Sequence, residues 1–429
     1  MMGRRTGMWL LLLALVIAGA AWARMHTQTR AEPAVLRTVP LRGQPLNIAV
    51  DSRMGRAFVA AQDTRTLTGG GSVGVVDTRT GRLLTTIAVG TNPQVVAVDE
   101  PTSRAFVLDA GYGGVRYTVS VLDTRGDTLL RTVPITGGRP DAVALDGRTG
   151  HVFVVNAGLV GRLGAATGLG SVTMLDARSA SVVRTTRVGS NPTSIAADEL
   201  TGRVFVVNSG ATIASPSSVS VLDAATGAVL ATVGAGRGAG AVVVDEGTGR
   251  VFVAGGNMVR VLDARTGRVL RVTLAGDGPL AVDAHTGHVL IVDQRSGTMS
   301  ILDGHDGHVL RTVPQAVPVG AGDVPIGIAV NPRSGLLFVA IDSADGGRVS
   351  ILDAWTGALR RTFAVGSDPA AIAMDARAGH AIVGFVGDGP LRDARPQVAA
   401  PAWLRWLPFF PQPTPPQAPG SVSLLDGAR

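Results

Sequence analysis

The sequence contains no cysteine and no lysine, and aromatic residues make up only 4% of its 429 positions. Without cysteine, the chain forms no disulfide, no thiolate metal site, no thioether-linked lipid anchor and no covalent haem attachment. Without lysine, all 39 basic side chains are arginine, set against 32 acidic ones. Because aromatic residues are not interleaved with the arginines, a stacking surface for single-stranded nucleic acid is not expected.

The first 23 residues have the features of an export signal. Arg4 and Arg5 precede an apolar run from Met8 to Ala23 that ends in small residues. This run is shorter than the ~20 residues that a membrane span needs, so we expect a signal peptide cleaved after Ala23. An uncleaved anchor that associates the chain with a membrane is the alternative. Residues 24–34 are then a linker, and the protein is extracytoplasmic, whether secreted, periplasmic or on the cell surface.

Four short segments recur in fixed order after residue 35. The first ends in a turn acid, the second follows a T-G-R-like turn, the third reads V-S-V-L-D, and the fourth reads L-R-T-V. The repeats begin 40 to 52 residues apart, at Pro45, Pro93, Pro140, Pro192, Ala239, Pro279, Pro325 and Pro369. Four predicted strands in a repeat of this length are typical of a β-propeller blade.

The order of the segments also predicts how the ring closes. The first L-R-T-V copy, Leu36 to Val39, stands alone before the first complete repeat, and the last repeat stops after its third segment. We therefore predict an all-β protein in which residues 35–429 form eight four-stranded blades. The N-terminal strand supplies the missing outer strand of blade eight, which removes two exposed sheet edges.

The repeats resemble a known family. Phe153-Val154-Val155-Asn156 and Phe205-Val206-Val207-Asn208 are similar to the Y-V-T-N tetrad of YVTN-type β-propeller repeat proteins, with Phe for Tyr. The similarity covers residues 35 to about 385 and 420 to 427. It implies an exported or surface protein of this fold, and some members bind other macromolecules. Members commonly have seven blades, so a seven-bladed ring is the alternative to our count.

Alternating strand direction places the connections on two opposite faces. On one, which we call the constant face, the turns are short and carry fifteen aspartates and Asn331 at equivalent positions, where they are expected to cap the turns. On the other, the variable face, loops are long and dissimilar: 60–72, 109–118, 156–171, 208–218 and 386–420. Divergent loops on a constant scaffold indicate the working face.

Two groups of residues on the variable face are candidates for contact with a ligand or partner. Asp109, Asn156, Asn208 and Asp293 share one position at the end of the second strand, where loop capping is the favoured role and contact with a ligand or partner the alternative. The insertion 386–420 carries the other group, Trp403, Trp406, Phe409 and Phe410, between prolines. These aromatics suit a lid over the propeller, an anchor for a partner, or an interfacial membrane contact.

The sequence does not assemble a recognisable catalytic or cofactor site. Four histidines fall in two neighbouring turns of the sixth repeat, where solvated turn positions are the favoured interpretation over a Zn²⁺ or Ni²⁺ site: His285, His288, His305 and His308. The tryptophans of quinone-binding propellers are missing. We therefore predict no cofactor and a monomeric, non-catalytic scaffold that binds a protein, polymer or small ligand. The alternative is a lactonase-like hydrolase or quinoprotein-like oxidoreductase with polar groups converging on the propeller axis.

Overall fold

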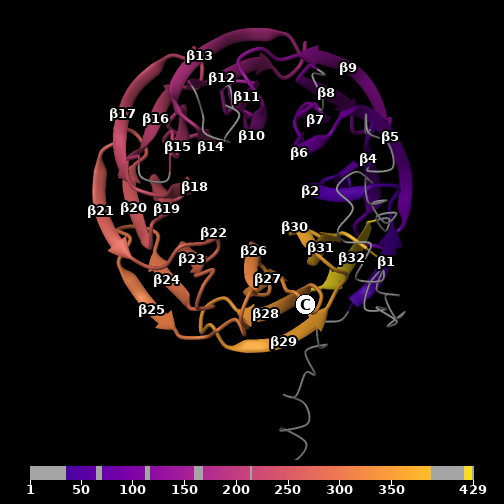
Figure 1. Cartoon of the computed structure of the whole chain (residues 1–429), viewed down its shortest axis with the longest axis vertical. Coiled ribbons are helices and arrows are strands. Elements are labelled where there is room, and N and C mark those ends of the chain that lie inside the picture. The colour runs from indigo at the N-terminus through magenta and orange to yellow at the C-terminus, as the bar shows by residue number, and fades with distance from the viewer. Residues whose placement is uncertain are drawn as a thin grey trace, which may run out of the picture.

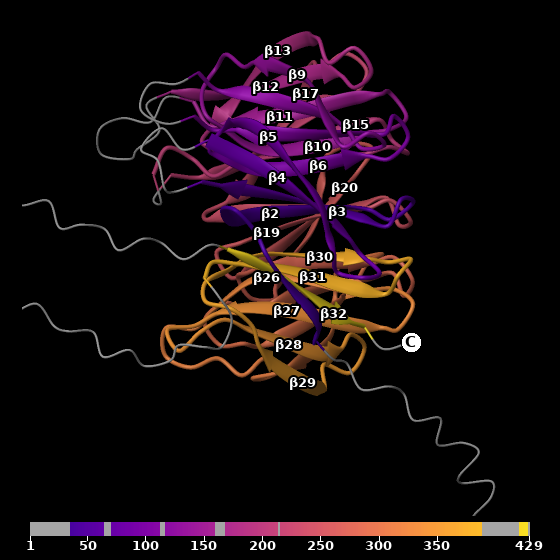
Figure 2. The ribbon, with the colours of Figure 1, turned by 90° about the vertical axis from the view of Figure 1, so that its right-hand side faces the viewer.

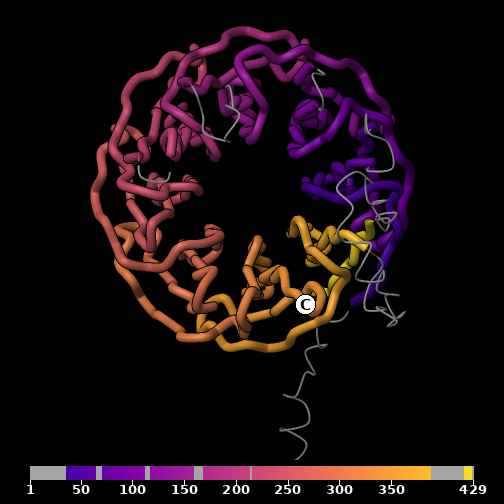
Figure 3. The backbone as a smooth tube through the Cα atoms, viewed as in Figure 1, coloured from indigo at the N-terminus to yellow at the C-terminus, as the bar shows by residue number. Residues whose placement is uncertain are grey.

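In this computed structural model the described residues are 35–63, 70–111, 116–158, 168–212, 215–387 and 420–427. Within these ranges the chain forms 32 strands and no helix, and so none that could span a membrane. The strands form eight four-stranded sheets arranged in a ring (Figure 1). The chain trace shows the sheets following one another around a central axis (Figure 3). The predicted eight-bladed β-propeller is confirmed.

The two inner strands of each blade follow the first two segments of the repeat. The innermost strands, numbered from blade one to blade eight, are β2 (Gln44–Asp51), β6 (Pro93–Asp99), β10 (Pro140–Asp146), β14 (Pro192–Asp198), β18 (Ala239–Asp245), β22 (Leu280–Asp283), β26 (Val324–Asn331) and β30 (Pro369–Asp375). The second strands are β3 (Arg56–Gln62), β7 (Arg104–Asp109), β11 (His151–Asn156), β15 (Arg203–Asn208), β19 (Arg250–Gly255), β23 (His288–Val292), β27 (Leu336–Asp342) and β31 (His380–Phe385).

The two outer strands follow the third and fourth segments. The third strands are β4 (Gly70–Asp77), β8 (Thr118–Asp123), β12 (Leu169–Asp176), β16 (Ser217–Asp223), β20 (Met258–Asp263), β24 (Met299–Asp303), β28 (Arg348–Asp353) and β32 (Ser421–Asp426). The outermost strands are β5 (Leu83–Thr91), β9 (Thr128–Pro134), β13 (Val182–Ser190), β17 (Val229–Gly236), β21 (Val269–Leu274), β25 (Val309–Val313), β29 (Leu359–Ala364) and, in blade eight, β1 (Val35–Pro40).

Strand β1 closes the ring as predicted. It pairs antiparallel with β32, with Arg37 opposite Leu424 and Thr38 opposite Ser423. The sheet order β1-β32-β31-β30 therefore joins the two ends of the described chain in one blade. The backbone N–H and C=O groups of β32 would otherwise form an open edge able to pair with another chain.

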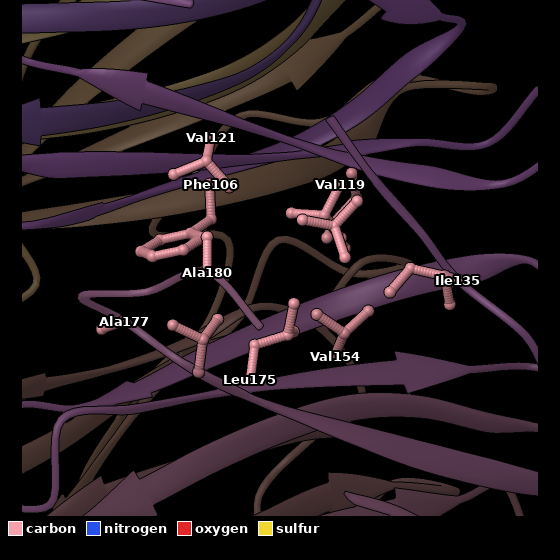
Figure 4. Packing of buried hydrophobic residues seen from close by; sticks show 11 residues of the cluster. Phe106, Val119, Val121, Ile135, Val154, Leu175, Ala177 and Ala180 are labelled. Atoms are coloured by element: carbon pink, nitrogen blue, oxygen red, sulfur yellow. The ribbon is translucent and has the colours of Figure 1, made fainter. Parts of the chain in front are cut away.

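The core lies between neighbouring blades. Phe106, Val119 and Val121 of blade two pack against Val154 and Leu175 of blade three, and all five side chains are fully buried (Figure 4). The second and third strands of a blade are covered on both faces, which explains their continuous apolar sequences. The outermost strands are covered on one face only, so they alternate apolar residues with arginine and threonine.

The constant-face turns are held by their aspartates, as expected. Asp223 Oδ1 accepts hydrogen bonds from the backbone N–H of Thr226 at 2.9 Å and of Ala225 at 3.1 Å. Gly227 ends the turn with a φ of +67°, a conformation that disfavours any side chain. Viewed from the side, the strands run between the two faces of the ring (Figure 2). The constant-face turns thus hold the strands of each blade together at one end, and the opposite ends of the strands carry the variable loops.

Outer-strand arginines join neighbouring blades near the same face. Arg184 of blade three donates to the carbonyl of Thr226, in the turn of blade four, at 3.3 Å. Arg131 of blade two makes the equivalent bond to the carbonyl of Ser179 at 3.2 Å. These arginines therefore serve the scaffold.

Candidate functional site

Three of the predicted variable-face residues are buried inside their blades. Asp109, Asn156 and Asn208 are 0%, 0% and 1% exposed, respectively. Each follows an apolar second strand, and each side chain turns toward the third strand of its own blade. The Asp109 carboxylate accepts hydrogen bonds from the hydroxyls of Thr118 at 3.0 Å and Ser120 at 2.7 Å.

The two asparagines make the matching contacts with their amide groups. Asn156 Nδ2 donates to Thr173 Oγ1 at 3.0 Å, and Asn208 Nδ2 donates to Ser220 Oγ at 3.0 Å. The segment that links one blade to the next covers these side chains. For example, a Cβ built on Gly189, near the end of β13, would lie 2.6 Å from Cγ of Asn208. These three residues therefore lie under the interblade linkers and do not face solvent.

Burial leaves these polar groups incompletely satisfied. Asp109 Oδ1, Asn156 Oδ1 and Asn208 Oδ1 are buried atoms without a hydrogen-bond partner in the described part of the protein. Burial raises the pKa of Asp109 to about 6, although hydrogen bonds from Ser120 and Thr118 act in the opposite direction. Each of the three side chains thus caps a loop in its own blade, and each keeps one oxygen atom without a hydrogen-bond donor.

Asp293 occupies the equivalent position in blade six but behaves differently. It begins a tight turn, in which its Oδ1 accepts the backbone N–H of Ser296 at 2.8 Å. Its Oδ2 accepts the backbone N–H of Asp277, in the linker from blade five, at 3.0 Å. Burial raises its pKa, but these N–H donors and the Ser296 hydroxyl outweigh burial and hold the pKa below its usual value. The carboxylate is thus turned toward backbone groups.

A pocket of about 650 Å³ opens beside Asp293, between blades five and six. Blade five contributes Asn257, Leu274 and the linker 275–277, and blade six contributes Ser300 and Thr312 from its two outer strands. Arg295, Ser296 and Thr298 of the Asp293 turn complete the lining. The pocket lies at the variable-face ends of the strands, and hydroxyl, carboxylate, guanidinium and amide groups all reach it.

The sequence did not single out the pocket residues beyond Asp293. A signal was present, because Asp293-Gln-Arg-Ser-Gly297 repeats, on the variable side, the D-x-x-[ST]-G pattern of the constant-face turns. Such a turn shortens the loop and engages the aspartate locally. The sequence alone does not reveal that this leaves space above Ser300.

The innermost strands carry one further perturbed acid. Asp141 is the extra residue of a β-bulge at the start of β10 and forms an ion pair of 2.8 Å with Arg139. Burial raises its pKa, and the Arg139 guanidinium only partly offsets this.

His285, His305 and His308 of blade six lie in constant-face turns, and His288 begins strand β23. Asp303, Asp306 and His308 bring their ligand atoms within 4.8 Å of one another. The turn itself accounts for this, because Asp303 Oδ1 accepts the backbone N–H of His305 at 2.7 Å and Asp306 Oδ1 lies 2.6 Å from His308 Nδ1. His288 instead stacks on Trp355, with ring centroids 4.7 Å apart.

Some candidates lie outside the described residues. These are Trp403, Trp406, Phe409 and Phe410 and the N-terminal segment 1–23. Their predicted roles stay predictions.

The ring and its closure define the protein as an eight-bladed β-propeller. It is similar in structure to hydrazine synthase from Kuenenia stuttgartiensis, with a TM-score of 0.54 and 15% sequence identity. The similarity covers 80% of this chain and 94% of that one. At this identity the likeness concerns the fold alone. No protein-family model and no curated protein matches the chain.

Proposed function

We propose that this protein is an exported, non-catalytic β-propeller scaffold that binds a protein, polymer or small ligand through its variable face. One observation carries the proposal: the polar pocket between blades five and six lies on that face. It occurs where blade six departs from the repeat, as expected of a binding site added to a regular scaffold.

Three features of the sequence support export and binding. Residues 1–23 have the pattern of a secretory signal. The resemblance to YVTN-type repeats, which we propose reflects membership of that family, favours an exported or surface protein. Four large aromatics within 386–420 are costly to leave in water. The similarity to hydrazine synthase concerns the fold, and we infer no enzymatic activity from it.

The alternative is an extracytoplasmic enzyme with a site near the propeller axis. The observation that favours it is Asp141, whose pKa is raised by burial on an innermost strand. Its ion pair with Arg139 gives it a structural role instead. Asp109, whose pKa burial raises to about 6, is 0% exposed.

Cell fractionation and affinity capture test the proposal. The protein should be found outside the cytoplasm, and its immobilised form should retain a component of an envelope extract. Ser300→Arg, which fills the pocket, should lose that component, whereas deletion of 386–420 tests the insertion separately. Replacing Trp403, Trp406, Phe409 and Phe410 by serine then distinguishes a lid, which loses stability, from an anchor, which loses retention. A cytoplasmic protein that retains nothing would refute the proposal.

A further inference from the structure

The pocket occupies the space that the side chain at the end of the second strand fills in blades two and four. In blade two, Asp109 lies over the central hydroxyl of the third strand, Ser120, at 2.7 Å. In blade four, Asn208 lies over Ser220 in the same way, at 3.0 Å. The equivalent hydroxyl in blade six is Ser300. Asp293 does not cover it, because its carboxylate is held by the turn and by the linker N–H of Asp277.

The hydroxyls beneath this space lack protein partners. Ser300 is 3% exposed, and its hydroxyl makes no hydrogen bond within the described residues. Thr312 lies opposite it on β25 and is likewise unbonded there. In blade seven the same pair, Ser350 and Thr362, is joined by a hydrogen bond of 3.1 Å. Because buried polar groups normally have partners, the Ser300 hydroxyl points to a ligand that supplies one, and the exposed Thr312 beside it can offer that ligand a second hydrogen bond.

Charged groups of both signs surround the pocket, two carboxylates and one guanidinium. The Asp277 carboxylate and the Arg295 guanidinium both line it, and neither side chain makes a hydrogen bond or ion pair with the described residues. The charge of Asp293 is already compensated by backbone N–H donors. A simple anion would meet two carboxylates, and a simple cation would meet the guanidinium. A neutral ligand with many donors and acceptors fits this arrangement.

The pocket also has an apolar side. Leu274, the last residue of β21, lines it and is 66% exposed. A sugar ring combines hydroxyls, each able to donate and accept a hydrogen bond, with C–H groups that pack on apolar side chains. The volume of about 650 Å³ lies within the ~300–1,000 Å³ typical of small-ligand sites. We propose that the pocket binds a neutral oligosaccharide, an inference that rests on the proposed binding function of the variable face.

Blade five shows how the site can be closed. Arg260 holds the strand position of Ser300, and its guanidinium lies against Gly236, the last residue of β17. The residue at the end of its second strand is Gly255, which leaves room for it. Ser300→Arg therefore introduces a side chain that the repeat already accommodates elsewhere, and it should fill the pocket without unfolding the ring.

Calorimetry with purified sugars tests the proposal on the full chain. The probes are maltotriose, cellotriose, mannotriose and chitotriose, with trigalacturonic acid as the charged comparison. The wild type should bind at least one neutral sugar. Thr312→Ala should weaken binding about three- to tenfold, and Ser300→Arg should abolish it. Thr232→Ala is the matched control, because Thr232 has the position of Thr312 in blade four, opposite Ser220, and should bind like wild type.

The outcomes separate this inference from the proposed function. If no neutral sugar binds, or trigalacturonic acid binds best, the ligand class is wrong. Retention of an envelope component that is lost in Ser300→Arg would still leave the binding function standing. If the extract is not retained either, both proposals fail. If Ser300→Arg lowers the melting temperature, Ser300→Ala, which removes only the hydroxyl, replaces it in the test. Equal sugar affinity in Ser300→Ala and wild type would also overturn the inference.

Discussion

The hydroxyls of Thr38 and Ser423 share a hydrogen bond of 2.7 Å, although 385 residues separate them in the chain. The bond lies across the β1–β32 pairing that joins the first and last strands. Each blade packs on the next, so the loss of one strand from blade eight should also weaken the packing of the two blades beside it.

The first prediction concerns this closure. Deleting Ala31 to Leu41 removes β1 and exposes the edge of β32, so the shortened protein should aggregate or unfold with much lower cooperativity. Size-exclusion chromatography and chemical denaturation measure this. Unfolding like that of the intact chain would mean that β1 contributes little to the ring.

A second prediction uses Asp109. Its pKa rises from 3.8 in the unfolded chain to about 6 in the folded protein, so the folded state holds more protons between these values. Stability should therefore fall as pH rises from about 4 to 6 and stay reduced above that. Asp109→Asn, which reproduces the residue of blades three and four, should stabilise the protein by up to about 3 kcal/mol at pH 7.

Denaturant titrations from pH 4 to pH 8 check this prediction. The advantage of the variant should shrink toward pH 4, where the wild-type carboxyl is protonated as well. Asn208→Asp is the reciprocal change and should destabilise the protein mainly above pH 6. A gain in Asp109→Asn that does not depend on pH would point to packing instead of charge.

The third prediction concerns glycines near the ends of two outermost strands, β13 and β17. A Cβ on Gly189 would lie 2.6 Å from Cγ of Asn208, so Gly189→Ala should cost about 1–3 kcal/mol through overpacking. Gly234, in β17, has open space around its Cα, and Gly234→Ala should be close to neutral. Equal effects of the two substitutions in chemical denaturation would contradict the conclusion that Gly189 packs closely over Asn208.

The last prediction concerns the constant-face turns. Burial raises the pKa of Asp223, but donors from Thr226 and Ala225 outweigh it and lower the net value. Its contribution is therefore present above about pH 4 and lost as pH falls through the lowered pKa. Asp223→Ala should cost about 1 kcal/mol at pH 7 and progressively less in acid. Asn331→Ala removes an uncharged cap from the turn between the first and second strands of blade seven and should show a pH-independent loss.

The sequence predicted the fold and its closure because both follow from the order of local segments. The isolated Leu36–Val39 copy and the incomplete last repeat sufficed to place β1 in blade eight. The site was harder. A polar residue after an apolar strand, such as Asn208, reads equally well as a surface contact or a cap. Which one it is depends on Gly189, a residue of the preceding blade that covers it.

Among the described strands, β1 is the first to leave the ribosome, and its partner β32 is the last. Arg37 and its partner Leu424 are separated by a stretch that takes about 20–80 s to translate at ~5–20 residues per second. Throughout that time the lone strand has nothing to pair with, and the growing arc of blades keeps an open edge at its advancing end. The ring therefore cannot close before β32 has been made, and a nascent chain interrupted at any earlier blade is a species with a free sheet edge.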